Sequence, residues 1–236
     1  MFKHLAAQLP GSLQFRLKRA YFRALILQSR FTSEEPEFAL LKEWLSPGDV
    51  AIDVGANVGC FTRRMAEVVG PRGSVFAFEP MQESFRLLAA NVGDCANVMP
   101  LRLAASDRGR DVYMDLPRFQ SGLANYYQAS ISEQGTHRVR TIPLDILDVD
   151  RVALIKIDAE GHELSVLQGA QRLIERCHPR LIVEGSETTE AWLRERGYQI
   201  KRLEGSPNFV AHYAAEGSSA VSIKAGSGRE SLEQRG

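Results

Sequence analysis

The sequence predicts an α/β fold with a mainly parallel sheet, an antiparallel edge strand and helices on both faces of the sheet. Between residues 46 and 213, short apolar segments alternate with amphipathic segments, which is typical of βαβ units and parallel strands. Near the end of this region, two strand-like segments follow each other without a helix between them and predict the antiparallel edge. The chain has 236 residues, 44% of them hydrophobic, which is enough for one large core.

The individual elements follow from runs of apolar residues and from their spacing. We expect strands at 50–54, 74–78, 98–105, 152–158, 180–184, 198–203 and 208–213, with further β-like segments at 111–116 and 138–144. One helix is expected to end near Gly70, and a second covers 81–92. A third helix places six apolar residues from Val166 to Cys177 on one side, and a short fourth helix covers about 188–196.

Composition and charge exclude several classes of protein. Lys and Arg together number 29, as do Asp and Glu, so the formal net charge is zero and a general nucleic-acid binder is not expected. The start of the chain lacks the apolar stretch of a secretory signal, and we expect no membrane-spanning helix. Cys60, Cys95 and Cys177 are odd in number and far apart, so they predict neither a disulfide framework nor a zinc site and fit a reducing cytoplasm.

The chain divides into three zones by composition. Residues 1–45 look helical, residues 46–213 form the α/β domain, and nine of the 23 residues in 214–236 are Gly or Ser. The last zone is expected to be a flexible tail, with a docking tail as the alternative.

The expected N-terminal helix has a stripe of apolar residues beside a basic side. The stripe consists of Leu13, Leu17, Ala20, Ala24 and Leu27. The basic residues are Arg16, Arg19, Arg23 and Arg30, and no acid lies between residues 11 and 30. One interpretation is a helix that packs on the domain with its basic side in solvent, and the other is an interfacial helix that contacts anionic lipid or a partner.

A glycine-rich turn, DVGANVG at 53–59, connects the first strand to the first helix of the domain. Glycines let the backbone turn tightly and approach a ligand closely, and ligands bind at such turns in open parallel sheets. The spacing is neither that of a P-loop nor G-x-G-x-x-G, so nucleotide hydrolysis is not expected. A purely structural turn is the alternative interpretation.

An acid at the end of the second strand strengthens the ligand interpretation. Glu79 follows Gly59 by 20 residues and can accept hydrogen bonds from the hydroxyls of a ribose, although an acid there can also cap the helix that follows. Turn and acid together favour a cofactor that contains adenosine. A carboxylate at Asp53 would repel a pyrophosphate but suits the ammonium group of S-adenosylmethionine, so the sequence favours that cofactor over NAD.

A second polar cluster follows the fourth strand of the domain. Asp158, Glu160, His162 and Glu163 lie within six residues, at the same sheet edge as the glycine-rich turn. Three carboxylates so close together are costly unless they bind something. The alternatives are that both glutamates cap the following helix and that His162 is a surface residue.

These segments together resemble FkbM-type methyltransferases. Residues 47–59 resemble the first motif of that family, and 78–80 and 155–163 resemble two others. Residues 167–170 and 182–184 extend the match. The resemblance implies a Rossmann-like methyltransferase fold, S-adenosylmethionine as cofactor, and methylation of hydroxyl groups on sugars or secondary metabolites.

The resemblance also assigns roles to residues of this chain. The turn residues Asp53, Gly55, Ala56, Asn57 and Gly59 would bind the cofactor around its methionine part. Glu79 would hold the ribose, Ser106 would lie near the adenine, and Asp158 would sit beside the methyl-transfer centre. The match covers about residues 40–205, so the N-terminal helix and the C-terminal tail lie outside it.

An unactivated hydroxyl needs a proton acceptor near pH 7. Asp158 and Glu160 are the first candidates for this catalytic role, and His137 is a third, with an ordinary loop histidine as its alternative. The polar stretch 117–137 is expected to recognise the substrate through residues such as Tyr126 and Tyr127, unless it is simply disordered.

The expected function is an O-methyltransferase that acts on a small molecule or glycan in the cytoplasm, without nucleic acid as a partner. No metal is required by the residues, although the carboxylate cluster can accommodate one. The alternatives are a cofactor-binding protein without catalytic activity, an N-methyltransferase and, less favoured, a nicotinamide-dependent oxidoreductase.

Overall fold

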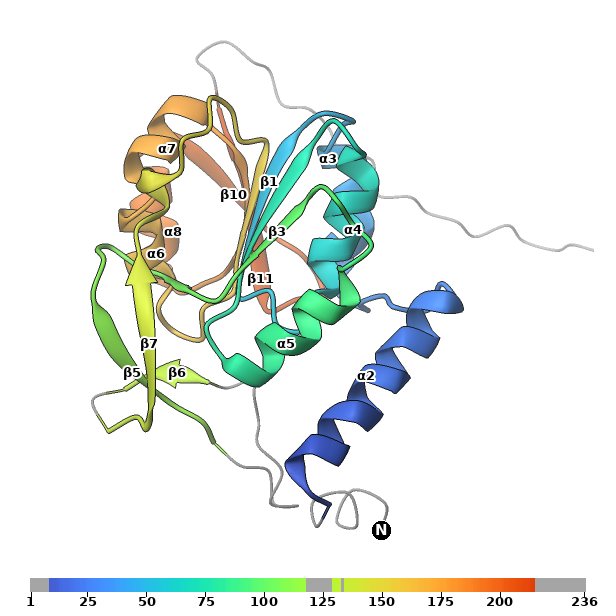
Figure 1. Ribbon diagram of the computed structural model, residues 1–236. Helices are drawn as coiled ribbons and strands as arrows, with labels where there is room; N and C mark the ends of the chain where they lie inside the picture. Colours follow the sequence, from blue (N-terminus) through green and yellow to red (C-terminus); the bar gives the residue numbers. More distant parts are fainter. Residues whose placement is uncertain (1–8, 118–128, 133, 215–236) are drawn as a thin grey trace, which may run out of the picture.

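The computed structural model describes residues 9–117, 129–132 and 134–214, and it shows a central sheet between two layers of helices (Figure 1). The strands of this sheet are β1 (Val50–Val54), β2 (Ser74–Phe78), β3 (Val98–Leu101), β8 (Leu154–Ile157), β9 (Arg180–Glu184), β10 (Tyr198–Arg202) and β11 (Asn208–Tyr213). The helices are α2 (Gly11–Leu27), α3 (Pro36–Trp44), α4 (Cys60–Val69), α5 (Gln82–Asn91), α6 (Glu163–Gln168), α7 (Gln171–Cys177), α8 (Glu187–Arg194) and the short 3-10 helix η2 (Leu144–Ile146).

The order of the strands in the sheet is β10-β11-β9-β8-β1-β2-β3. Five of them run parallel, and Ile52 of β1 lies between Phe76 of β2 and Ile155 of β8. β11 pairs antiparallel with both β9 and β10, so the predicted fold class and its antiparallel edge are confirmed. Since β1, β2, β8 and β9 are parallel, their C-terminal ends meet at one side of the sheet, which we call the carboxyl edge.

Each face of the sheet is covered by three helices. α3, α4 and α5 lie on one face, and α6, α7 and α8 lie on the other (Figure 1). On the first face, the ring of Phe38 packs edge-on against that of Phe61 with 5.1 Å between centroids, and Leu41 and Met65 are fully buried beside them. α3 therefore shares the core of the sheet, although it precedes residue 46. The division at residues 45 and 213 stays a prediction.

Two predicted elements are each interrupted. The strand expected at 98–105 splits into β3 and the short β4 (Ala104–Ala105), which belongs to a different sheet. The helix expected through 166–177 breaks at Gly169 into α6 and α7. A Cβ atom at Gly169 would lie 1.9 Å from the carbonyl oxygen of Ser106, so the chain bends where two backbones touch. The apolar periodicity continued across this break and concealed it.

A second, smaller sheet lies beside the carboxyl edge. It contains β4, β5 (Asp111–Asp115), β6 (Ser130–Ile131) and β7 (His137–Ile142), in the order β4-β7-β5-β6. The β-like segments at 111–116 and 138–144 supply two of its strands, whereas β6 was not predicted. Figure 1 shows β5, β6 and β7 below the ends of the large sheet.

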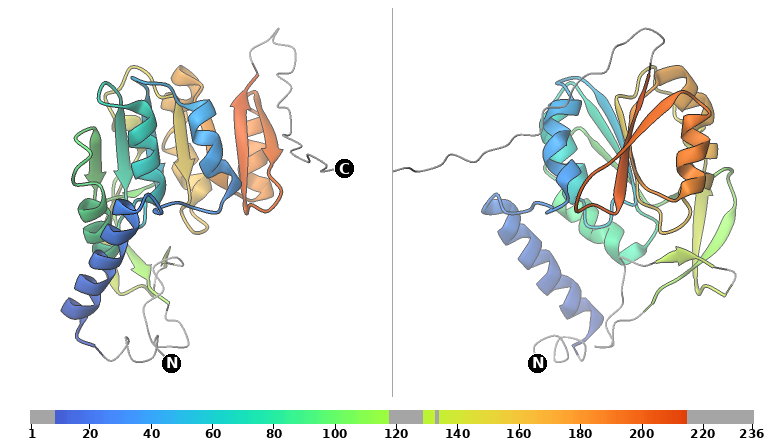
Figure 2. Two further views of the ribbon diagram at one scale, coloured as in Figure 1. Left: turned by 90° about the vertical axis from the view of Figure 1, so that its right-hand side faces the viewer. Right: turned by 180° about the vertical axis from the view of Figure 1, so that it is seen from behind.

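The N-terminal helix α2 stands apart from the sheet, as the view from behind shows (Figure 2). None of its residues is buried, and Leu13, Leu17 and Leu27 of the predicted stripe are exposed by 39%, 52% and 77%. The helix packs on the domain, as one interpretation held, but this stripe is not the side that makes the contact. The helix contacts α5 through its opposite side, where the Arg86 guanidinium lies 4.0 Å from the centre of the Phe15 ring.

Among the described residues, no helix has both the length and the apolar composition needed to cross a bilayer. Residues 215–236 of the expected tail at 214–236 lie outside the described residues, as do Tyr126 and Tyr127 of the expected substrate-recognition stretch. The predictions about these segments stay predictions.

The close approach at Gly169 predicts a stability effect. Gly169→Ala is expected to lower the free energy of unfolding by about 1–3 kcal/mol, because the backbone of Ser106 must shift to admit a Cβ atom. Gly109→Ala is the control, since its Cβ would find its nearest neighbours at an ordinary 3.6 Å. Urea denaturation of both variants measures the difference, and equal midpoints would contradict the prediction.

Candidate active site

A cleft opens at the carboxyl edge, between the ends of the large sheet and the small sheet. Its acidic lining residues are Glu35, Glu79, Asp158, Glu160 and Glu184. Its large apolar lining residues are Val54, Phe78, Pro80, Met81, Leu103, Met114 and Ile131. The cleft therefore combines a negative side at the ends of β8 and β9 with an apolar side at the ends of β2, β4 and β5.

The glycine-rich turn after β1 forms the floor of the cleft. Gly55 has a φ of +77°, and a Cβ atom there would lie 1.9 Å from the carbonyl oxygen of Asp158. Only glycine fits such an approach, so the ends of β1 and β8 are held against each other at this residue. Asn57 also has a positive φ, +49°, which asparagine tolerates better than most residues. Both Gly55 and Asn57 line the cleft. Their predicted role in cofactor binding stays a prediction.

Glu79 joins this turn to the end of β2. Its carboxylate accepts a hydrogen bond from the backbone N–H of Asn57 at 2.9 Å and another from the N–H of Met81 at 2.8 Å. Met81 is the N-cap of α5, so the capping interpretation is correct in part, while the bond to Asn57 shows a second role in shaping the turn. Burial raises the pKa of Glu79 to about 7, against the effect of both backbone donors. Each oxygen keeps a lone pair that a ligand hydroxyl can use.

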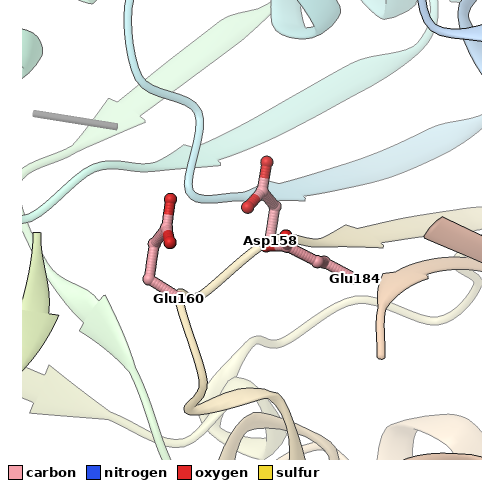
Figure 3. A group of neighbouring side chains, drawn as sticks. All are labelled: Asp158, Glu160 and Glu184. Atoms are coloured by element: carbon pink, nitrogen blue, oxygen red, sulfur yellow. The ribbon is translucent and has the colours of Figure 1, made fainter. Parts of the chain in front are cut away.

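Three carboxyl groups gather at the ends of β8 and β9 (Figure 3). Asp158, Glu160 and Glu184 each offer an oxygen within 4.8 Å of the other two. Asp158 and Glu160 were predicted as catalytic, whereas Glu184 was quoted only as part of a motif. The position of Glu184 in the sequence could have indicated its place in the site. It is the last residue of a buried strand, as Glu79 is the first residue after one. Burial raises the pKa of Glu184 to about 7, and its hydrogen bond to Asp158 acts in the same direction.

Lys156 is a functional residue that the sequence reasoning did not assign. Its side chain is only 4% exposed, and its ammonium group lies 2.8 Å from a carboxylate oxygen of Asp158. The ammonium group also lies 5.0 Å from the centre of the Phe61 ring. Burial acts to raise the pKa of Asp158, but the charge of Lys156 and the hydrogen bond from it hold that pKa below its usual range. A lone lysine inside an apolar strand was the signal for this pair.

Asp53 lies beneath the glycine-rich turn rather than among the lining residues. It is fully buried, and one of its oxygens accepts a hydrogen bond of 2.6 Å from the Thr62 hydroxyl of α4. Its other oxygen has no hydrogen-bond partner among the described residues. Burial raises the pKa of Asp53, whereas nearby Lys156 opposes that shift. Any effect of Asp53 on a ligand in the cleft therefore acts through its charge and not through contact.

Ser106 lies behind the cleft and holds a residue that lines it. Its hydroxyl is fully buried and lies 2.9 Å from Nε2 of His162. His162 lines the cleft, so it is not the simple surface residue considered as its alternative. Burial lowers the pKa of His162, which keeps the imidazole neutral near pH 7. The predicted contact between Ser106 and an adenine ring stays a prediction.

Three other predicted site residues do not line the cleft. Ala56 is buried against α5, and Gly59 is the N-cap of α4, where a Cβ atom would meet Leu88 at 2.7 Å. His137 is an exposed residue at the start of β7, and its Nδ1 lies 3.2 Å from the Thr136 hydroxyl. The structure thus brings Asp158 and Glu160 together and leaves His137 outside the cleft.

The segment before α3 adds an unexpected acid to the cleft. Glu35 accepts a hydrogen bond from the side-chain amide of Asn208 at 3.2 Å, and Asn208 also donates to the buried Glu37. Burial raises the pKa of Glu35. Residues before 46 therefore form part of the cleft, which their position outside the motifs did not indicate.

With this geometry established, comparison with known proteins identifies the class of the protein. Residues 53–200 match the family described as the methyltransferase FkbM domain, which is more than half of the chain. The protein belongs to this family of S-adenosylmethionine-dependent methyltransferases, as the resemblance of its motifs implied.

Individual relatives support this assignment. The chain is 33% identical over 141 residues to the hexuronic acid methyltransferase AglP of Haloferax volcanii. The aligned region covers 58% of this chain and 56% of that protein. It is 32% identical over 165 residues to the AMB antimetabolite synthetase AmbE of Pseudomonas aeruginosa, covering 53% of this chain and 8% of that protein. The chain thus spans about half the length of the first relative and a small part of the second.

A solved structure shows the same fold. The methyltransferase FkbM of Methylobacillus flagellatus superposes on 72% of this chain and 44% of its own, with a TM-score of 0.54 and 20% sequence identity. The predicted Rossmann-like methyltransferase fold is therefore confirmed.

The residues of the cleft fit S-adenosylmethionine chemically. The apolar side suits an adenine ring, and the carboxylates suit a sulfonium and an ammonium group. The Asp53 carboxyl beneath the turn keeps one oxygen without a hydrogen-bond partner among the described residues. The residues that would hold the cofactor are those of the turn and Glu79, with Asp158 beside them.

Breaking the buried ion pair between Lys156 and Asp158 is expected to reduce stability by an amount that depends on pH. Lys156→Met is expected to lower the free energy of unfolding at pH 8 by about 3–5 kcal/mol, because Asp53 and Asp158 lose their positive neighbour. Without it their pKa values rise in the folded protein, so the loss shrinks as pH falls toward 5 and the carboxylates become protonated.

The matched control for this prediction is the double variant Lys156→Met/Asp158→Asn, which removes one uncompensated carboxylate and should regain part of the stability. Denaturation in urea at both pH values measures the effect. A single variant as stable as the unchanged protein at pH 8 would show that the pair contributes nothing.

Proposed function

We propose that the protein transfers a methyl group from S-adenosylmethionine to a hydroxyl group of a sugar, a glycan or a secondary metabolite. The observation that carries the proposal is the group of carboxyls at the ends of β8 and β9, which offers proton acceptors beside a cleft suited to the cofactor. The hexuronic acid methyltransferase among the relatives supports a sugar as the acceptor.

The cleft residues divide into those for the cofactor and those for the reaction. Gly55, Asn57 and Glu79 bind the cofactor along the turn and the end of β2, with the Glu79 carboxylate on the ribose hydroxyls. When bound, S-adenosylmethionine supplies the methyl group: the acceptor oxygen bonds to the methyl carbon, the carbon–sulfur bond breaks, and S-adenosylhomocysteine remains. The residues of the chain mainly align the reactants, which contributes up to about 7–11 kcal/mol in favourable cases.

The three carboxyls have different parts in this reaction. Asp158 is ionised because Lys156 holds its pKa low, so it keeps a permanent negative charge beside the reacting centre but is a weak proton acceptor. Glu184 has a pKa of about 7, which suits a group that takes up the hydroxyl proton at neutral pH. Glu160 also has a raised pKa, through burial and the charge of Asp158, and is the second candidate.

The acidic lining also bears on the acceptor. Five glutamates and aspartates face the cleft, so a phosphate-rich acceptor such as nucleic acid is repelled, while a neutral hydroxylated ring is not. We further expect a cytoplasmic protein, since the three cysteines are all unpaired.

Two measurements test the function directly. Calorimetry should show binding of S-adenosylhomocysteine and no binding of NAD. Methyl transfer from labelled cofactor should then be found in a screen of glycans, sugars and hydroxylated metabolites, with methyl-ether products. Binding without transfer to any of these would favour the catalytically silent alternative, and transfer to amines alone would favour N-methylation.

Asp158→Asn is expected to reduce turnover at least about a hundredfold, since the neutral side chain removes the fixed charge beside the reacting centre. Binding of S-adenosylhomocysteine should survive at least in part, because the turn and Glu79 are unchanged. The test compares kcat with the dissociation constant for that product. Unchanged turnover would remove Asp158 from the mechanism.

Glu184→Gln is expected to reduce kcat by about 10²–10⁴-fold, because the hydroxyl proton loses its acceptor. In the unchanged protein kcat should fall as pH drops below about 7, where Glu184 becomes protonated, and this dependence should disappear in the variant. The control is Glu187→Gln on the exposed start of α8. An unchanged pH profile in Glu184→Gln would instead favour Glu160, which the variant Glu160→Gln then tests.

The same assay separates proton acceptance from metal binding at the three carboxyls. Because Lys156 already supplies a positive charge to Asp158, we expect turnover to continue in the presence of a strong chelator. Loss of turnover with the chelator and its return with Mg²⁺ would show that Asp158, Glu160 and Glu184 together bind a cation instead.

A further inference from the structure

The helix α2 has two separate apolar sides, and the residues that the structure describes cover only one of them. The covered side faces α5 and consists of the half-buried Phe15, Phe22, Leu25 and Ile26. The Arg86 guanidinium over the Phe15 ring fixes this contact. At 100° per residue, these four residues lie on one side of the helix, and the predicted stripe lies on the other.

The uncovered side is the stripe with Tyr21 added. Leu13, Leu17, Tyr21 and Leu27 are exposed by 39%, 52%, 60% and 77%. They are four of the eight exposed large hydrophobic residues in the described part of the chain, so half of this surface gathers on one helix. Single exposed apolar residues are ordinary, whereas a continuous row of them marks a contact surface.

Positive charge adjoins this row. Arg16 and Arg23 lie directly beside the stripe, and Arg19 continues the same side of the helix. Arg30 follows shortly after the helix ends at Leu27. Residues 1–33 contain no Asp or Glu, although the whole chain has no net charge. The basic character is therefore concentrated on this helix, next to its uncovered apolar row.

We propose that α2 attaches the protein to the surface of an anionic membrane, with the row of Leu13, Leu17, Tyr21 and Leu27 among the lipid chains and the neighbouring arginines at the headgroups. An apolar row bordered by arginines and free of acids is the arrangement of a helix that lies in the membrane interface. A second copy of the chain fits less well, because two such helices side by side would oppose arginine to arginine without a carboxylate on either.

The attachment leaves the cleft accessible. α2 extends past the carboxyl edge of the sheet, on the side where the cleft opens (Figure 1). The helix thus places the cleft near the lipid surface without covering it. The proposal does not depend on the acceptor or on the reaction.

The test is flotation of the full chain with two kinds of vesicle. One contains phosphatidylcholine alone, and the other contains phosphatidylcholine with one third phosphatidylglycerol. We expect flotation with the anionic vesicles, at least tenfold less with the neutral ones, and release at high salt because exposed charges are screened.

Variants assign the contact to α2. Leu17→Gln/Tyr21→Gln and Arg16→Gln/Arg23→Gln should each reduce flotation at least tenfold. The controls are Ile146→Gln, which changes another exposed hydrophobic residue, and Arg102→Gln, which changes an exposed arginine elsewhere. Thermal unfolding checks that each variant keeps its fold, which is expected since none of these residues is buried.

Three results would overturn the proposal. The first is a chain that does not float with anionic vesicles, and the second is flotation that the α2 variants leave unchanged. The third is a dimer in solution that Leu17→Gln/Tyr21→Gln converts to a monomer, since a second copy would then cover the row.

Discussion

The buried ammonium group of Lys156 is the interaction on which the carboxyl edge depends. Parallel strands end together, so a cleft built from their ends collects carboxylates that repel one another. In this protein they are Asp158 and Glu184, with Asp53 buried beneath the glycine-rich turn. Lys156 lies on β8, two residues before Asp158, and compensates part of that charge from below. The close contact of Gly55 with the Asp158 backbone is possible because glycine has no Cβ atom. Sequence motifs describe the carboxylates, whereas the cation that lets them coexist is a single residue in an apolar strand.

The ionisation of two acids connects stability with ligand binding. Glu79 and Glu184 have pKa values of about 7 in the folded protein and ordinary lower values when unfolded. Between those values the folded state holds protons that the unfolded state has lost, so stability falls as pH rises toward 7. A cationic cofactor in the cleft favours the ionised forms and offsets this loss.

Most of the large sheet could be predicted from the sequence, because its strands are continuous apolar runs between turns. Two predicted elements were interrupted where segments far apart in the sequence contact each other. These are the helix that breaks at Gly169 and the strand that separates into β3 and β4. In the site, Glu79 and Asp158 were predictable because each lies at the end of a predicted parallel strand. Glu35 and Lys156 were not, since the first reaches the cleft through the packing of α3 and the second through the register of β8 with β1.

The helix α2 shows why periodicity identifies a helix better than it identifies the buried side. Its sequence contains an aliphatic row from Leu13 to Leu27 and an aromatic row with Phe15 and Phe22 on the other side. The aliphatic row is longer, so periodicity favours it as the buried one. The structure places the half-buried aromatic row against the domain instead, where the Arg86 guanidinium of α5 stacks on the Phe15 ring. The helix contacts its own domain through the shorter aromatic row and leaves the longer aliphatic row exposed. The arginines beside the exposed row are the reason for proposing an anionic membrane as the surface that covers it.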